Sequence, residues 1–170
     1  MIAEPAMPHI RRLTVDDVAA YRAIRLEALT EAPAAFASTA ADFALRSDAA
    51  LRVTLAELIL FGAFRNGEPV GLMGLMRNGS SKMAHRATVI MVYVRADERG
   101  RALADALLAT VTEHARGMGL RQLELAVAVE NAPALAFYRR QGFAEVGRIP
   151  AGFLHEGREI DEILMMRRIT

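Results

Sequence analysis

Cysteine is absent from the 170 residues of this chain, and its absence removes several kinds of chemistry at once. Without thiols the chain forms no disulfides, builds no thiolate metal site and carries no acyl group on a cysteine. Histidine is scarce as well. The four histidines are scattered without HxxxH or HExxH spacing, at His9, His85, His114 and His155. A zinc site therefore has little support in the sequence.

An excess of charge of either sign is also missing. Lys and Arg number 21 and Asp and Glu number 20, which leaves a formal net charge of +1. This balance gives no support to nucleic acid or an anionic membrane as the main partner. No apolar run approaches the roughly 20 residues of a membrane span, and the opening MIAEPAMPHIRR lacks the regions of a signal peptide. We expect a soluble, cytoplasmic protein.

The composition favours one folded domain. Hydrophobic residues make up 53% of the chain and charged residues 24%, which suits an ordinary globular core. The length fits a single domain. We expect that domain to occupy residues 9–170, preceded by a loose lead-in over residues 1–8, where two prolines stand without any periodicity.

Apolar periodicity predicts the element order β-α-α-β-β-β-α-β-α-β-β. Thr14 and Asp17 have the spacing of a capping box ahead of a first helix that Pro33 ends. Ser47 is a candidate cap for a second helix, and the segment 34–46 is ambiguous. The expected strands are 9–13, 59–64, 70–76, 87–94, 123–127, 143–149 and 160–169, and the later helices are 102–117 and 133–141. This pattern predicts an α+β domain with a parallel strand–helix–strand unit at 87–127.

The stretch from Val92 to Leu108 is the most informative. A buried strand ends there and a helix opens at Arg99-Gly100-Arg101-Ala102-Leu103-Ala104, with small residues at 100, 102 and 104. Free N–H groups in the first turn of a helix suit phosphate oxygens, and small residues let an anion approach the backbone. An ordinary helix start with two arginines is the plain alternative.

A second stretch runs from Asn131 to Phe143. An Asn after a strand end can satisfy polar groups of a ligand, and the Tyr138 phenol is a candidate proton donor. Core packing is the plain alternative for a Tyr beside a Phe on a short helix.

Taken together, the two stretches resemble the GNAT superfamily of acetyl-CoA-dependent N-acetyltransferases. Arg99–Ala104 matches the first and last positions of the family signature [Q/R]-x-x-G-x-[G/A], although Ala102 stands at its central Gly. Asn131, Tyr138, Gly142 and Phe143 match the second signature. The element order agrees from about residue 9 to residue 169. The resemblance implies a mixed, predominantly antiparallel central sheet flanked by helices.

The resemblance also implies a placement for acetyl-CoA, between splayed strands 87–94 and 122–128. Its pantetheine arm would pair with the backbone of Val92 and Val94 like an added strand. Its pyrophosphate would contact the N–H groups of Arg99, Gly100, Arg101, Ala102, Leu103 and Ala104. Asn131 would contact the pantetheine, and Tyr138 would lie beside the thioester sulfur. Acetyl would pass directly to an amine, without an acyl-enzyme.

The base that deprotonates the amine is left open by the sequence. Strand 87–94 carries no carboxylate, so the candidates are Glu27, Glu124, His85 or a water relay; a solvated surface role is the alternative for each side chain, and His114 beside Glu113 suggests a solvated helix face. The acceptor pocket is expected from the first two helices, the 34–46 loop and the final hairpin. Candidate lining residues are Phe36, Phe153, His155 and Glu156.

Three functions compete on this evidence. The first is acetylation of a small-molecule primary amine, and the second is acetylation of N-terminal or lysine amines of proteins. The third is a non-catalytic acyl-CoA-binding sensor, which the retained Tyr138 and the small residues at 100, 102 and 104 make less favoured. Edge strands in the final hairpin suggest a homodimer.

Overall fold

The structure is a computed structural model that describes residues 6–170. The first five positions of the expected lead-in lie outside the described residues. The strands are β1 (His9–Arg12), β2 (Ile59–Arg65), β3 (Glu68–Arg77), β4 (Arg86–Val94), β5 (Gln122–Ala128), β6 (Ala144–His155) and β7 (Arg158–Arg168). The α-helices are α1 (Val18–Glu31), α2 (Ala40–Ala44), α3 (Asp48–Glu57), α4 (Leu103–Gly117) and α5 (Ala132–Arg140). Short 3₁₀ turns are η1 (Val15–Asp17), η2 (Pro33–Ala35), η3 (Ser81–Met83) and η4 (Ala96–Glu98).

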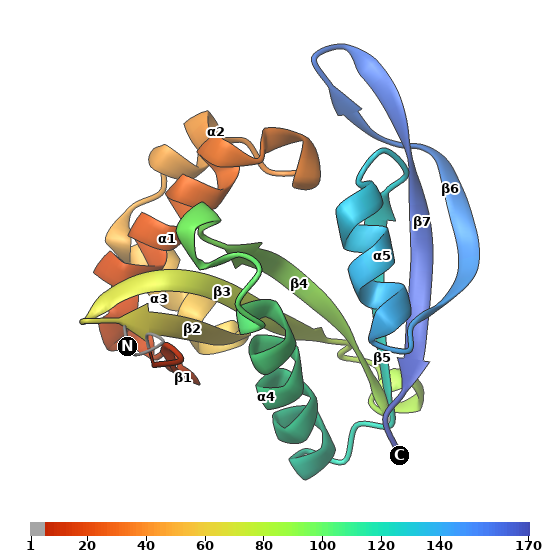
Figure 1. The fold of residues 1–170 in the computed structure, drawn as a ribbon, viewed down its shortest axis with the longest axis horizontal. Helices are drawn as coiled ribbons and strands as arrows, with labels where there is room; N and C mark the ends of the chain where they lie inside the picture. Colours follow the sequence, from red (N-terminus) through yellow and green to blue (C-terminus); the bar gives the residue numbers. More distant parts are fainter. Residues whose placement is uncertain (1–5) are drawn as a thin grey trace, which may run out of the picture.

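One seven-stranded sheet in the order β1-β2-β3-β4-β5-β7-β6 organises the described residues. Every neighbouring pair is antiparallel except β4 and β5, which are parallel and joined through α4. The parallel pairing covers only Arg86–Thr88 and Gln122–Glu124, and the two strands separate beyond it (Figure 1). The predicted α+β fold with a mixed, mostly antiparallel sheet is confirmed, and the sheet is split along the β4–β5 seam.

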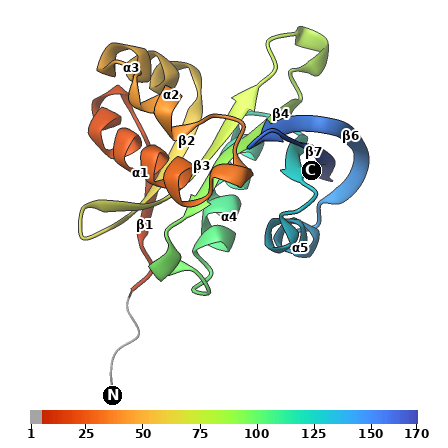
Figure 2. The ribbon, with the colours of Figure 1, turned by 90° about the horizontal axis from the view of Figure 1, so that it is seen from above.

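Helices cover the two faces of the sheet unequally (Figure 2). On one face α1, α2 and α3 pack on β1–β4, around fully buried residues such as Leu60 and Leu72. On the opposite face α4 and α5 pack on a larger cluster that continues into β5 and β7 and includes Leu107 and Leu123. Within residues 6–170, none of the helices α1–α5 packs on the α1-side face of β5 and β7, although the 3₁₀ turn η2 contacts β5.

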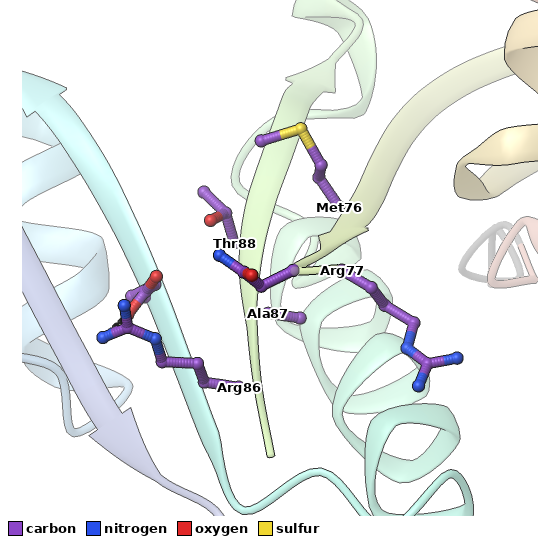
Figure 3. A pocket seen from close by; sticks show the side chains of 7 residues that line it. Met76, Arg77, Arg86, Ala87 and Thr88 are labelled. Atoms are coloured by element: carbon purple, nitrogen blue, oxygen red, sulfur yellow. Dashed lines mark ion pairs between the residues drawn. The ribbon is translucent and has the colours of Figure 1, made fainter. Parts of the chain in front are cut away.

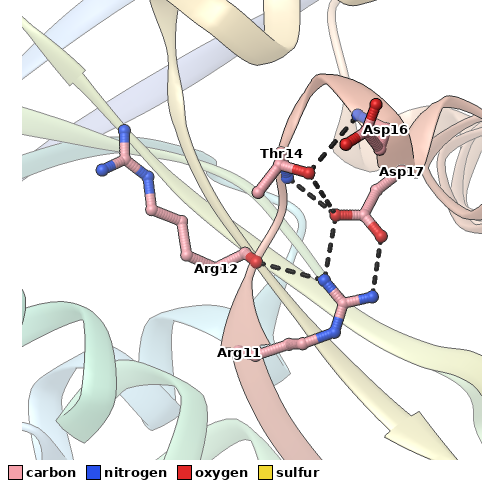
Figure 4. Close-up of polar contacts among 5 residues, drawn as sticks. All are labelled: Arg11, Arg12, Thr14, Asp16 and Asp17. Carbon is pink, nitrogen blue, oxygen red and sulfur yellow. Dashed lines mark hydrogen bonds and ion pairs between the residues drawn. The ribbon is translucent and has the colours of Figure 1, made fainter.

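The entry into α1 follows from the local sequence. The Thr14 hydroxyl accepts a hydrogen bond from the backbone N–H of Asp16, and the Asp17 carboxylate accepts one from the Thr14 N–H at 2.7 Å (Figure 4). Arg11 forms an ion pair with the same carboxylate at 2.7 Å. The predicted capping box is therefore present. It caps the N-terminus of η1, which continues directly into α1.

Three boundaries differ from the sequence expectation. The segment 34–46 is no simple loop, because Thr39 caps the short helix α2. Strand β6 continues to His155, beyond the expected end at residue 149. Its pairing with β7 is irregular between Ile149 and Phe153, where Ala151 has a positive φ of 50°. Helix α4 begins at Leu103 and not at Ala102, since Ala102 has left-handed backbone angles of φ 59° and ψ 15°.

Candidate active site

Among the residues that the structure describes, the separation of β4 from β5 leaves one edge of β4 without a strand partner. Beyond Thr88, β4 is paired with β3 alone. The N–H of Arg95 donates to the Val70 carbonyl of β3 at 2.9 Å. Backbone groups alternate along a strand, so the N–H and C=O groups of Val92 and Val94 point to the opposite side, toward β5. The Val94 carbonyl accepts a hydrogen bond from Arg99 Nε at 3.0 Å instead of from a strand. An extended ligand segment can pair with this edge.

A bulge marks the middle of the opening. Leu72 faces Tyr93 across the ladder and Gly74 faces Ile90, so β4 holds one residue more than β3 between these pairs. Met91 takes up the extra length with a positive φ of 55°. Such a bulge bends its strand and turns backbone groups away from the ladder, and this one lies on the strand that borders the opening.

The loop Arg99–Ala102 connects the opening to α4. Gly100 and Ala102 both have positive φ, 73° and 59°, and the four residues are exposed. Alternation of left-handed residues with ordinary ones directs successive N–H groups into a concave anion-binding turn, and the first turn of α4 adds its own free N–H groups. The donors fit a pyrophosphate. The left-handed angle at Ala102 also explains why a glycine suits this position of the family signature.

A buried ion pair anchors this loop. Glu98, 3% exposed, ends η4 and accepts hydrogen bonds from Arg65 of β2, one of them at 2.8 Å from Nη2. These hydrogen bonds lower the pKa of Glu98, against the effect of burial. No sequence pattern predicts the pair, because its members lie 33 residues apart. Arg65 therefore neutralises a carboxylate that stands directly before the proposed phosphate loop.

Asn131 has a structural role that the sequence reading did not assign. Its side-chain oxygen accepts the Ala134 N–H at 3.3 Å and caps α5, whose first turn holds Pro133. The carboxamide oxygen is thus occupied, which leaves the amide N–H groups as the donors that a ligand in the opening could use.

Tyr138 lies on the α4 and α5 side of the sheet. The residue is 6% exposed, and its ring packs edge-on against Phe137 and Phe143. Burial raises the pKa of its hydroxyl, so the phenol stays protonated. The structure thus shows the core packing of Tyr138, and its role as proton donor stays a prediction.

Glu27 is a poor candidate for the base. Its carboxylate accepts the Tyr93 hydroxyl at 3.0 Å and forms an ion pair with Arg95 at 3.0 Å. Burial alone would raise the pKa of Glu27, but the hydrogen bonds from Arg95 and Tyr93 outweigh it and lower the pKa. Burial and the bond to Glu27 together raise the pKa of Tyr93 to about 12. The cluster joins α1 to the end of β4.

Glu124 lies on what we call the open face, the α1-side surface of the sheet beyond β4. Its members pair across β4, β5 and β7, point away from the α4 core and are at least partly exposed: Thr88, Glu124, Ala126, Leu164 and Met166. The Glu124 carboxylate lies 3.5 Å from Arg86. Of the two candidate carboxylates, only Glu124 is placed on this face.

A hollow of about 50 Å³ lies beside Glu124 at the base of the opening. It is lined by Met76, Arg77, Asn78, Arg86, Ala87, Thr88 and Glu124 (Figure 3). Ligand pockets usually measure about 300–1,000 Å³, so this hollow suits water and not a substrate. Its volume leaves room for water beside the Glu124 carboxylate.

The remaining sequence candidates lie apart from one another. His114 contradicts the expectation of a solvated helix face: its ring packs edge-on against Phe61, its Nε2 is buried without a hydrogen-bond partner, and burial lowers its pKa. His85 precedes β4. Phe153, His155 and Glu156 lie along the end of the β6–β7 hairpin. Within residues 6–170 no group of three or more metal-binding side chains gathers.

The chain belongs to the GNAT family of acetyltransferases. The family model described as "Acetyltransferase (GNAT) family" matches residues 22–143. This range contains both signatures, so the expectation of an acetyl-CoA-dependent N-acetyltransferase family is confirmed. None of the helices within the described residues is long and apolar enough to cross a membrane.

Two curated relatives match parts of the chain. An uncharacterized N-acetyltransferase from Methanocaldococcus jannaschii is 40% identical over 82 residues, which are 47% of this chain and 36% of the relative. An L-methionine sulfoximine/L-methionine sulfone acetyltransferase from Pseudomonas aeruginosa is 38% identical over 74 residues, 44% of this chain and 43% of the relative. Each match thus spans less than half of the relative.

Solved structures match nearly the whole fold. A ribosomal-protein-alanine N-acetyltransferase from Brucella melitensis is 27% identical with a TM-score of 0.78, covering 94% of this chain and 99% of that one. A Salmonella typhimurium protein solved with its cofactor acetyl-CoA is 21% identical with a TM-score of 0.80, covering 98% and 95%. The second likeness shows a shared fold.

Proposed function

We propose that this chain transfers acetyl from acetyl-CoA directly to the primary amine of a small molecule. The observation that carries the proposal is the unpaired edge of β4, which leads straight into the exposed N–H-rich loop before α4. An extended pantetheine and a pyrophosphate need these two features in this order. Family membership supports the same chemistry.

Each matched residue takes one task in this proposal. Val92 and Val94 pair with the pantetheine amides, and residues 99–104 bind the pyrophosphate, with charge from Arg99 and Arg101. The amide N–H groups of Asn131 contact the pantetheine. Tyr138, kept protonated by burial, gives its proton to the departing thiolate of CoA.

The amine loses its proton on the open face. We assign this step to Glu124 acting through water, because it is the candidate carboxylate on that face and lies beside a water-sized hollow. Glu27 is held by two partners at 3.0 Å, Arg95 and Tyr93, whereas Glu124 has one looser ion pair, with Arg86 at 3.5 Å. The amine then attacks the thioester carbonyl, the C–S bond breaks, and acetyl passes to nitrogen without an intermediate on the protein.

A small-molecule acceptor is favoured over a protein by the Pseudomonas relative, whose name gives an amino-acid analogue as substrate. Acetylation of a protein amine is the second candidate, because the Brucella neighbour is titled as an enzyme of that kind. We further propose a cytoplasmic location and a homodimer. The dimer is suggested by edge strand β6, which exposes Val146, Ile149 and Leu154.

Measurement of CoA release tests the function. The purified chain is incubated with acetyl-CoA and a panel of amino acids, amines and peptides with free N-termini. We expect turnover to be fastest with one small-molecule class. Turnover confined to peptides would favour the second candidate. Tight binding of acetyl-CoA without turnover on any acceptor would favour the sensor.

A further inference from the structure

Arg25 is a buried arginine without an acidic partner in the described part of the chain. The residue is 5% exposed, although it stands on the outer helix α1. Its Nη1 is buried and makes no hydrogen bond, and none of the ion pairs among the described residues involves it. A buried guanidinium is normally paired, because removal of a charge from water is unfavourable unless another charge compensates it.

The surroundings of Arg25 offer partial compensation only. Its guanidinium carbon lies 4.7 Å from the centre of the Phe36 ring, a cation–π contact. Glu27, two residues further along the same helix, does not face Arg25 and is occupied by Arg95 and Tyr93. A planar guanidinium with free donors matches a carboxylate in two parallel hydrogen bonds, so the missing partner has the chemistry of a carboxylate.

Arg25 lies beside the opening between the strands. One turn earlier on α1, the Tyr21 hydroxyl lies 3.6 Å from the sulfur of Met91, the bulge residue of β4. On the other side, η2 packs against β5, and Phe36 follows directly after η2. Because its guanidinium lies over Phe36, Arg25 is on the side of α1 that is near both the bulge and the segment in contact with β5.

We propose that Arg25 binds the carboxylate of the acceptor, and that the acceptor is therefore an amine of the amino-acid class. This inference rests on the proposed function and narrows it. The pyrophosphate is assigned to residues 99–104 at the far end of β4, so Arg25 is free for a second anion. Phe36 covers the guanidinium and contributes apolar contact to the carbon chain of the same acceptor.

The test compares L-amino acids with their own α-carboxamides as acceptors. The two differ only in the charged group that Arg25 is proposed to bind. We expect the wild-type chain to prefer the acids by about 10- to 100-fold in kcat/KM, the range of a charge-assisted hydrogen-bond pair. In Arg25→Met the KM of the acid should rise by that factor, while the KM of the carboxamide and the affinity for acetyl-CoA stay within about twofold.

Two further variants separate binding from folding. Arg22→Met removes an arginine on the same helix that already pairs with Asp48, and it should keep the preference for acids. Arg25→Lys keeps the charge but loses the planar fork, and it should keep part of the preference. Arg25→Met should unfold at the same urea concentration as wild type or higher, because it removes an unpaired buried charge.

Other outcomes overturn the inference. Equal kcat/KM of the wild type for acids and carboxamides would exclude recognition of the acceptor carboxylate. Turnover itself would still support the proposed function. An equal fall in kcat/KM for acids and carboxamides in Arg25→Met would indicate that Arg25 only positions Phe36. A change in the acetyl-CoA affinity of Arg25→Met would indicate that Arg25 contacts the cofactor and not the acceptor. Absence of turnover with every amine would remove the proposed function and this inference with it.

Discussion

The two halves of the sheet are built differently. Strands β1–β4 are covered on both faces, by α1–α3 on one side and α4 on the other. Strands β5 and β7 are covered by α4 and α5 on one face, and the other face carries partly exposed side chains, both polar and apolar, such as Glu124 and Leu164. Coverage on two faces gives rigidity, and the uncovered face provides access. The proposed chemistry lies at the seam between them.

Truncation of matched leucines is the strongest test of this difference. Leu60 of β2 is fully buried, and Leu164 of β7 lies partly exposed on the open face. Leu60→Ala should lower the free energy of unfolding by about 2–5 kcal/mol, and Leu164→Ala by about 1 kcal/mol or less. Urea denaturation measures both. Equal losses would mean that the open face is covered in solution, by a second copy for example.

Tyr138 relates to both halves of the comparison. It packs in the core under α4 and α5, and we propose that it acts at the opening between β4 and β5. Tyr138→Phe removes only the hydroxyl. We expect kcat to fall about tenfold or more, while acetyl-CoA affinity and the urea midpoint hardly change. The low end of the usual range is expected, because a thiol has a pKa near 8.5 on the cysteine model and leaves readily. A kcat within about twofold of wild type would assign the proton transfer to water.

Asp17 gives the covered half its own dependence on pH. The hydrogen bond from Arg11, opposed by burial, lowers the pKa of Asp17 from 3.8 to about 2. The folded-state pKa is below the unfolded value, so the contribution to stability is present above about pH 4 and is lost as the pH falls through about 2. Asp17→Asn should be about 1 kcal/mol less stable than wild type at pH 7. This difference in unfolding free energy should disappear as the pH falls from about 4 to about 2. A difference independent of pH would exclude the capping carboxylate as its source.

Ala102→Gly should have the smallest effect. Ala102 has a positive φ of 59°, a conformation that glycine adopts without strain. We expect the glycine variant to gain up to about 1 kcal/mol in unfolding free energy. A loss of stability would show that the loop adopts ordinary backbone angles in solution. Differential scanning calorimetry resolves this change.

Local features of the sequence predicted local structure well. The Thr14–Asp17 capping box, the Ser47 cap and the first-turn Pro133 depend on residues within one helical turn, and all three are present. The family signatures located the stretch before α4, although they did not show that Ala102 lies outside the helix. Features that depend on distant partners were missed.

The missed features share a physical cause. The Arg65–Glu98 pair and the unpartnered Arg25 both arise from packing between elements far apart in the chain. The bulge at Met91 arises from a mismatch with β3 and leaves no pattern in β4 itself. His114 appeared solvated from its neighbour Glu113, because helical periodicity alone does not show that the Phe61 ring lies against it.

Titration calorimetry of acetyl-CoA against wild type and Ala102→Asp tests the central claim most directly. We expect one acetyl-CoA per chain, with affinity about 10- to 100-fold weaker in the aspartate variant, because a carboxylate then faces the pyrophosphate. The unfolding temperature without ligand should hardly change, since residue 102 is exposed. Unchanged affinity in Ala102→Asp, or no binding by the wild type at about a hundredfold excess over the Kd of ordinary cofactor sites, would contradict the placement of acetyl-CoA at the β4–β5 opening.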